Sequence, residues 1–93
     1  MEKIQKGWKE FLELCVNTKD PKILAELLEL FLTIEEQESL ALRILIIKEL
    51  KAKKKTQREI AKDLNVSIAK ITRGSNALKK LSAKFSQFLD EVL

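Results

Sequence analysis

The chain is poor in the residues on which most enzyme active sites and disulfide-bonded proteins depend. It has no histidine, one cysteine, one proline and two glycines among 93 residues. The absence of histidine excludes a histidine-based triad, a zinc site of the Cys/His type and histidine acid–base catalysis. Because Cys15 is the only cysteine, no disulfide can form within the chain, and a reducing compartment fits. No acid pair, activated nucleophile or phosphate-cradling glycine loop stands out either, so we expect a protein that is not an enzyme.

Signals for membranes and secretion are also missing from the sequence. No stretch of about 18 apolar residues runs without a charge, and no signal peptide opens the chain. We therefore expect a cytoplasmic protein without a membrane partner.

What the sequence has in abundance is apolar surface. Hydrophobic residues make up 45% of a chain that is long enough for one small domain. A small helical monomer cannot bury that much apolar surface comfortably. The composition therefore favours an oligomer.

Charge is distributed very unevenly along the chain. Residues 1–47 carry a net charge of −3, residues 48–84 carry +9 and residues 85–93 carry −2. A basic block of this size is typical of a surface that binds nucleic-acid phosphates. The lysine run at 51–55 alone would indicate no more than a solvated surface.

The spacing of apolar residues predicts helices along the whole chain, and therefore an all-α fold. Asp20 is a good N-cap before Pro21, and Thr33–Glu36 and Thr56–Glu59 read as capping boxes. No alternating strand pattern or hairpin signal is present. The expected helices cover about 3–16, 21–31, 33–53, 56–64, 67–79 and 82–92.

The third of these helices is apolar nearly all round between Leu40 and Ile47. A helix with this composition is buried on every side. Since the chain is too short to surround it, we expect a second copy of the protein to do so. This pattern alone predicts a homodimer.

Residues 56–78 have the form of a helix-turn-helix, whose second helix enters the DNA major groove. Asn65 suits the turn, because asparagine tolerates the left-handed conformation, and Ser67 can cap the second helix. The residues expected to hold the two helices together are Ile60, Ala61, Leu64, Val66 and Ile71.

The outward side chains of this motif are suited to DNA by type. Arginine and lysine bond guanine edges, glutamine pairs with adenine, and alanine and isoleucine pack on thymine methyls. Hydroxyl groups suit phosphates. A helical hairpin with this spacing also occurs as a plain packing unit. The candidate DNA-binding residues are Gln57, Arg58, Ser67, Ile68, Ala69, Lys70, Thr72, Arg73 and Lys79.

Several local motifs resemble the Trp repressor family. They are the run Ile-Thr-Arg-Gly-Ser-Asn at Ile71–Asn76, the pair Leu32–Thr33, and the segments Ala41–Arg43 and Gln57–Glu59. The resemblance implies a six-helix chain that forms an intertwined homodimer with a second copy. It also implies L-tryptophan as corepressor, with no other cofactor, and a palindromic double-stranded operator of tryptophan biosynthesis or transport genes. Residues 1–93 would form a single domain, with 1–54 and 81–93 in the dimer core and 55–80 in the DNA-binding head.

The resemblance also implies a ligand pocket. Arg43 and Arg73 would sandwich the indole, and Arg73 would pair with the carboxylate. Gly74 would let the ring approach the helix backbone. The remaining implied pocket residues are Thr33 near the carboxylate, the backbone carbonyls of Leu30 and Leu32 of the partner chain near the ammonium, and Ala77 at the rim. Four positions depart from the family's usual pattern: Lys70 stands in place of a threonine, Ala77 in place of a serine, Ile34 in place of a proline, and Asn65 in place of the turn glycine.

Two other functions stay open at this point. One is a dimeric helix-turn-helix protein that binds DNA without a ligand or with a different effector. The other is a helical interaction module, similar to an antitoxin, whose basic face meets an acidic protein. A steep dependence of DNA binding on salt concentration would distinguish a DNA-binding protein from the interaction module.

Overall fold

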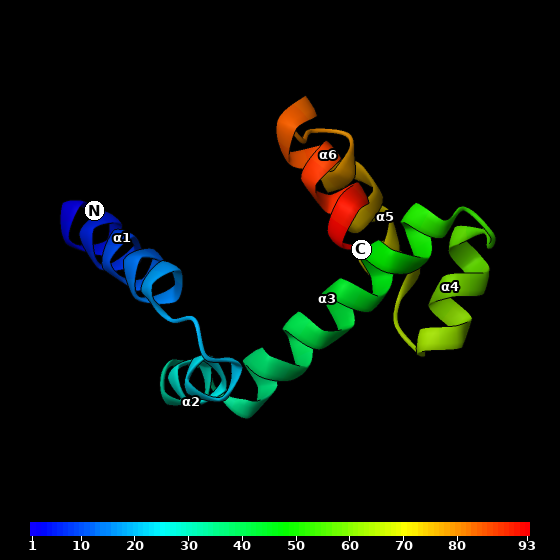
Figure 1. Ribbon diagram of the computed structural model, residues 1–93. Coiled ribbons are helices and arrows are strands. Elements are labelled where there is room, and N and C mark those ends of the chain that lie inside the picture. Colours follow the sequence, from blue (N-terminus) through cyan, green and yellow to red (C-terminus); the bar gives the residue numbers. More distant parts are fainter. The chain divides into compact units, whose positions relative to one another are not determined.

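The computed structural model describes residues 1–93 and contains six helices and no strand. This confirms the all-α prediction, and each predicted helix is present with its ends within one residue of the expected bounds. None of the helices combines the length and the apolarity that crossing a bilayer requires. The helices are α1 (Glu2–Asn17), α2 (Pro21–Phe31), α3 (Ile34–Ala52), α4 (Gln57–Leu64), α5 (Ile68–Leu78) and α6 (Ala83–Val92) (Figure 1).

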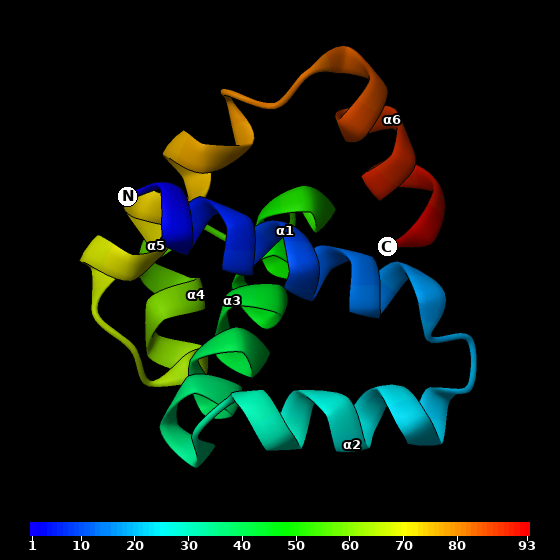
Figure 2. The same ribbon diagram turned by 90° about the vertical axis from the view of Figure 1, so that its left-hand side faces the viewer.

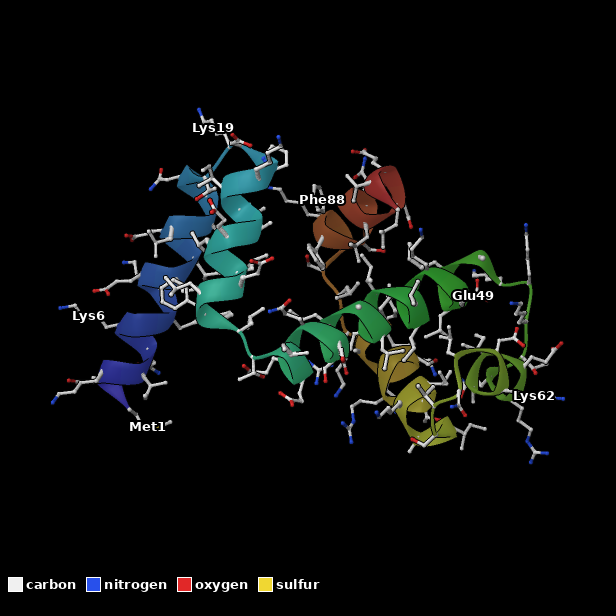
Figure 3. All side chains as sticks on the ribbon, turned by 90° about the horizontal axis from the view of Figure 1, so that it is seen from below. Met1, Lys6, Lys19, Glu49, Lys62 and Phe88 are labelled. Atoms are coloured by element: carbon white, nitrogen blue, oxygen red, sulfur yellow. The ribbon has the colours of Figure 1, made fainter.

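The chain divides into two compact units, residues 1–37 and 38–93. In the first unit, α1 and α2 run antiparallel, with Lys19 at the turn between them (Figures 2 and 3). The rings of Phe11 on α1 and Phe31 on α2 meet edge to face, with centroids 5.8 Å apart. The Asp20 carboxylate accepts a hydrogen bond from the Lys22 N–H at 2.9 Å, which confirms the predicted cap of α2.

The first unit ends in the predicted capping box of α3. The Thr33 N–H donates to Glu36 Oε1 at 2.8 Å, and the Glu36 N–H donates to Thr33 Oγ1 at 3.1 Å. Two N–H groups that the helix itself cannot satisfy are thereby paired. The start of α3 follows from these two side chains.

In the second unit, α4 and α5 pack against the C-terminal part of α3. The buried core consists of Ile46, Ile60, Ala61 and Ile71, and Leu50, Leu64 and Val66 pack against it. All five residues predicted to hold the motif together are among these seven. Because Ile60 and Ile71 are fully buried, they fix the angle between α4 and α5.

The turn between α4 and α5 is formed at Asn65, which adopts the predicted left-handed conformation with φ 54°. The Val66 N–H donates to the Ala61 carbonyl at 3.0 Å and closes the end of α4. Ser67 occupies the N-cap position of α5, but its side chain makes no capping hydrogen bond. The expectation of a Ser67 side-chain cap was therefore wrong, because the Lys70 N–H bonds the Ser67 backbone carbonyl instead, at 3.1 Å.

Two groups of ion pairs brace the second unit. The Lys55 ammonium lies 2.8 Å from a Glu49 carboxylate oxygen on α3 and 2.7 Å from an Asp63 oxygen on α4. Hydrogen bonds to Asp63 and Glu49 raise the pKa of Lys55 above its ordinary value. Lys51 on α3 pairs with Asp90 on α6. Two lysines of the basic run are thus used within the fold.

The apolar segment of α3 is only partly covered. Ile46 is 4% exposed, but Leu40 is 48% and Ile44 is 50% exposed. Within one chain, α4 and α5 cover one side of this segment only, as expected of a chain too short to surround it. The second copy that would cover the other side stays a prediction.

Candidate ligand pocket and nucleic-acid interface

A cavity of about 430 Å³ lies between α3 and α5. This volume is within the range of about 300–1,000 Å³ that small-molecule sites usually have. Its walls are two helix faces, because residues three or four positions apart lie on one side of a helix. The lining residues are Ser39, Leu42, Arg43, Ile46 and Ile47 of α3, and Lys70, Arg73, Gly74 and Ala77 of α5.

Gly74 on the α5 wall faces side chains of α3 at short range. A Cβ placed there would lie 3.1 Å from Ile46 Cγ2 and 3.4 Å from Leu50 Cδ1. The first distance is tighter than ordinary van der Waals contact, so a side chain at 74 would displace Ile46. The glycine therefore has a packing reason within the chain, in addition to the ligand contact that the resemblance implies.

The cavity combines an apolar floor with positive charge. Leu42, Ile46 and Ile47 supply apolar surface, and Arg43, Lys70 and Arg73 supply three cations. No carboxylate lines the cavity, and the ion pairs of the chain involve Lys51 and Lys55 only. Guanidinium groups stack on aromatic rings and bind carboxylates through two parallel hydrogen bonds. The cavity is therefore suited to an aromatic ring that carries a carboxylate.

Four of the seven predicted ligand residues line this cavity, namely Arg43, Arg73, Gly74 and Ala77. The prediction omitted the apolar floor and Ser39. Ser39, Ile46 and Ile47 lie three or four residues from Arg43, and Leu42 lies four from Ile46, so spacing on a predicted helix was the signal that could have identified them. Lys70 was placed among the candidate DNA-binding residues, at a position that the resemblance puts near both pocket and DNA, and in the structure it lines the cavity.

The other three predicted ligand residues belong to the first unit. Leu30 is 77% exposed near the end of α2, and the Leu32 carbonyl accepts a hydrogen bond from Gln37 Nε2 at 3.4 Å. The Thr33 hydroxyl accepts from the Glu36 N–H, as described above. The resemblance assigns Leu30 and Leu32 to the pocket of the partner chain, and this assignment stays a prediction.

The candidate DNA-binding residues lie on α4 and α5 or, for Ser67 and Lys79, directly at the two ends of α5, and most of them are exposed. Gln57 is half-buried, and its Oε1 accepts a hydrogen bond from the Thr72 hydroxyl at 3.0 Å. This bond joins the first turn of α4 to the middle of α5. Two of the candidate DNA-binding side chains are thus held together by a hydrogen bond between the helices.

A second, shallower hollow lies along α5. It is lined by Ala69, Thr72, Arg73, Asn76, Ala77 and Lys80. The DNA prediction omitted Asn76 and Lys80, although both follow Thr72 and Arg73 at helical spacing. Arg73 and Ala77 border this hollow as well as the cavity against α3.

The first turn of α4, which carries Gln57 and Arg58, is held by the second predicted capping box. The Thr56 N–H donates to Glu59 Oε1 at 2.9 Å, and the Glu59 N–H donates to Thr56 Oγ1 at 3.2 Å. The hydrogen bond from the Thr56 backbone is the main cause that lowers the pKa of Glu59, followed by the one to the Thr56 side chain. The capping box fixes where α4 begins.

Comparison with known proteins gives a consistent result. Residues 6–93 match the family described as Trp repressor protein. The chain is 52% identical over 88 residues to a Trp operon repressor homolog of Chlamydia caviae, covering 95% of this chain and 87% of that protein. It is 47% identical over 87 residues to a homolog of Chlamydia trachomatis (94% and 93% covered). It is also 41% identical over 86 residues to one of Histophilus somni (92% and 81% covered).

Proposed function

The chain belongs to the Trp repressor family, and from this premise we propose that it is a DNA-binding repressor with L-tryptophan as corepressor. Its targets would be palindromic operators of tryptophan biosynthesis or transport genes. It acts as a regulator in the cytoplasm, not as an enzyme, and it needs no other cofactor. The names of the relatives support this reading, because they are Trp operon repressor homologs.

One observation carries the proposal: α5 forms a wall of the ligand cavity and also carries most of the candidate DNA contacts. Arg73 faces both, since it borders the cavity against α3 and the shallow hollow along α5. A ligand that fills the cavity contacts the helix that enters the major groove. It can therefore favour the orientation of α5 that binds DNA.

The cavity supplies the chemistry that tryptophan requires. The indole lies on the apolar floor between the guanidinium planes of Arg43 and Arg73, and the carboxylate pairs with Arg73. The backbone carbonyls of Leu30 and Leu32 from the partner chain accept hydrogen bonds from the ammonium. Thr33 lies near the carboxylate.

The active form is a homodimer. A single chain buries only Ile46, Ile60, Ala61 and Ile71 among its hydrophobic residues, while Trp8 is 61% and Ile4 72% exposed. A second copy that covers these side chains would supply the core that one chain lacks. Two α5 helices related by a two-fold axis then match a palindromic operator.

Isothermal titration calorimetry of the purified protein with L-tryptophan tests the ligand, with L-phenylalanine as control. We expect saturable binding of one tryptophan per chain and no heat from phenylalanine. If tryptophan does not bind, the corepressor assignment is wrong and a ligand-independent helix-turn-helix protein replaces it.

Selection of duplexes from a random DNA library tests the second half of the proposal. We expect palindromic sequences to be enriched in the presence of L-tryptophan and far less in its absence. Equal enrichment under both conditions would leave a DNA-binding protein without a tryptophan switch. A lack of any enrichment would favour the protein-interaction module.

A further inference from the structure

Lys70 has no local structural reason to be a lysine. It lies in the first turn of α5, where the helix dipole disfavours a positive charge. Its ammonium makes no ion pair within the chain. The lysine is nonetheless one of the residues that line the cavity between α3 and α5.

The donors on the α5 wall of the cavity are few. Gly74 and Ala77 have no polar side-chain atoms, so Lys70 and Arg73 are the only side chains of that wall that can donate a hydrogen bond. The two are three positions apart on one helix, which places their Cβ atoms about 5–6 Å from each other. A carboxylate has two oxygens, and two cations at this spacing can bind one oxygen each.

We propose that Lys70 is a specificity-determining residue of the pocket, and that its ammonium binds the ligand carboxylate together with Arg73. The pocket would then select aromatic acids over analogues that have the same ring but lack the carboxylate. This inference rests on the proposed function, because it concerns the ligand group that the same cavity recognises. It assigns to Lys70 a role in the free protein that does not require DNA.

The charge balance of the cavity supports the proposal. Three cations and no carboxylate line it, so an unliganded cavity holds like charges close together. A carboxylate beside Lys70 and Arg73 relieves this repulsion, whereas an amide in the same position does not. Loss of the Lys70 charge therefore weakens binding of the acid but does not weaken binding of the amide, which has no carboxylate for Lys70 to bind.

The test is calorimetry without DNA, comparing L-tryptophan with L-tryptophanamide on wild type and Lys70→Gln. The Lys84→Gln variant is a matched control, since Lys84 is also an exposed lysine in the first turn of a helix, α6, but does not line the cavity. We expect Lys70→Gln to weaken L-tryptophan about three- to tenfold and the amide less than about twofold. Lys84→Gln should match wild type, and Lys70→Arg should restore most of the affinity for the acid.

Each outcome decides the question. Unchanged tryptophan affinity in Lys70→Gln overturns the inference, and DNA binding then remains as the expected role of Lys70. Equal weakening of the acid and the amide also overturns it, because Lys70 would then act through shape and not through the carboxylate. If wild type fails to bind tryptophan, the proposed function fails together with the inference, and the wild-type titration alone reveals this.

Discussion

At the scale of single residues, the proposed link between ligand and DNA depends on Arg43 and Arg73. Arg43 comes from α3 and Arg73 from α5, and both line one cavity. Neither guanidinium is paired with a carboxylate of the chain. Both are therefore available to an aromatic acid that enters between the helices.

Replacing Arg43 tests the pocket without touching the candidate DNA surface. We expect Arg43→Ala to weaken L-tryptophan by about tenfold or more, because a stacking guanidinium is lost. DNA binding without tryptophan and the helical circular dichroism spectrum should stay as in wild type. The Lys48→Ala variant, on the same helix but outside the cavity, is the control. An unchanged tryptophan response in Arg43→Ala would remove Arg43 from the site.

Gly74→Ala separates the packing role of the glycine from its ligand role. The new Cβ would lie 3.1 Å from Ile46 Cγ2, so Ile46 must shift. Alanine improves helix propensity by about 1 kcal/mol, while overpacking costs about 1–3 kcal/mol. We expect a modest net loss of stability in thermal unfolding and a clear loss of tryptophan affinity in calorimetry. Wild-type affinity in this variant would leave the glycine with a packing role only.

At the scale of helices, the sequence predicted the helix starts and the turn, because these depend on interactions between neighbouring residues. Pro21 after Asp20 and the two capping boxes set three helix starts, and neighbouring residues make each of these contacts. The left-handed Asn65 was predictable for the same reason. The missing side-chain cap at Ser67 was not predictable, because the Lys70 N–H that such a cap would bind donates to the Ser67 backbone carbonyl.

The parts of the site that depend on how two helices pack were not predictable from residue types. The close approach of Ile46 to Gly74 requires the distance between α3 and α5. The place of Lys70 on the cavity wall requires the rotation of α5 about its axis. The ligand roles of Arg43 and Arg73 came only from the family resemblance, since by residue type Arg43 could equally be a surface arginine that buries its aliphatic stem.

The capping box of α4 predicts a pH dependence. Hydrogen bonds from Thr56 lower the pKa of Glu59 below its ordinary value of 4.5. A lowered pKa in the folded state stabilises the fold above the pKa of the unfolded chain. That contribution is lost as the pH falls through the lower, folded value. Glutamine can still accept the N–H bond in a capping box but does not titrate.

We therefore expect the difference in unfolding free energy between wild type and Glu59→Gln to shrink as the pH falls from about 6 to about 3. Chemical denaturation at several pH values measures it. Other acidic groups titrate in both proteins and cancel in the difference. A difference that is constant with pH would mean that the Glu59 carboxylate is not held by Thr56.

At the scale of the whole molecule, one chain leaves most of its apolar side chains uncovered. Leu40 and Ile44 are both about half exposed and lie one turn apart on α3, and neither lines the cavity. The proposed function requires a second copy of the chain to cover the face of α3 that carries Leu40 and Ile44.

Ile44→Asp tests the dimer. In a monomer the change is at an exposed position, but in a dimer it buries a charge without a partner. We expect sedimentation equilibrium to give twice the 10.7 kDa chain mass for wild type and a lower mass or a large loss of stability for the variant. Lys54→Asp, an exposed change outside α3, should stay dimeric. A monomeric wild-type protein would contradict the prediction.

The central claim is that tryptophan and DNA act through the same helix, and linkage tests it most directly. Coupling between two ligands is reciprocal, so DNA must strengthen tryptophan binding by the factor by which tryptophan strengthens DNA binding. The measurement is the affinity for L-tryptophan with and without a saturating palindromic duplex from the selection. We predict tighter tryptophan binding in the presence of the duplex. Equal affinities under the two conditions would contradict the account, because α5 would then bind ligand and DNA independently.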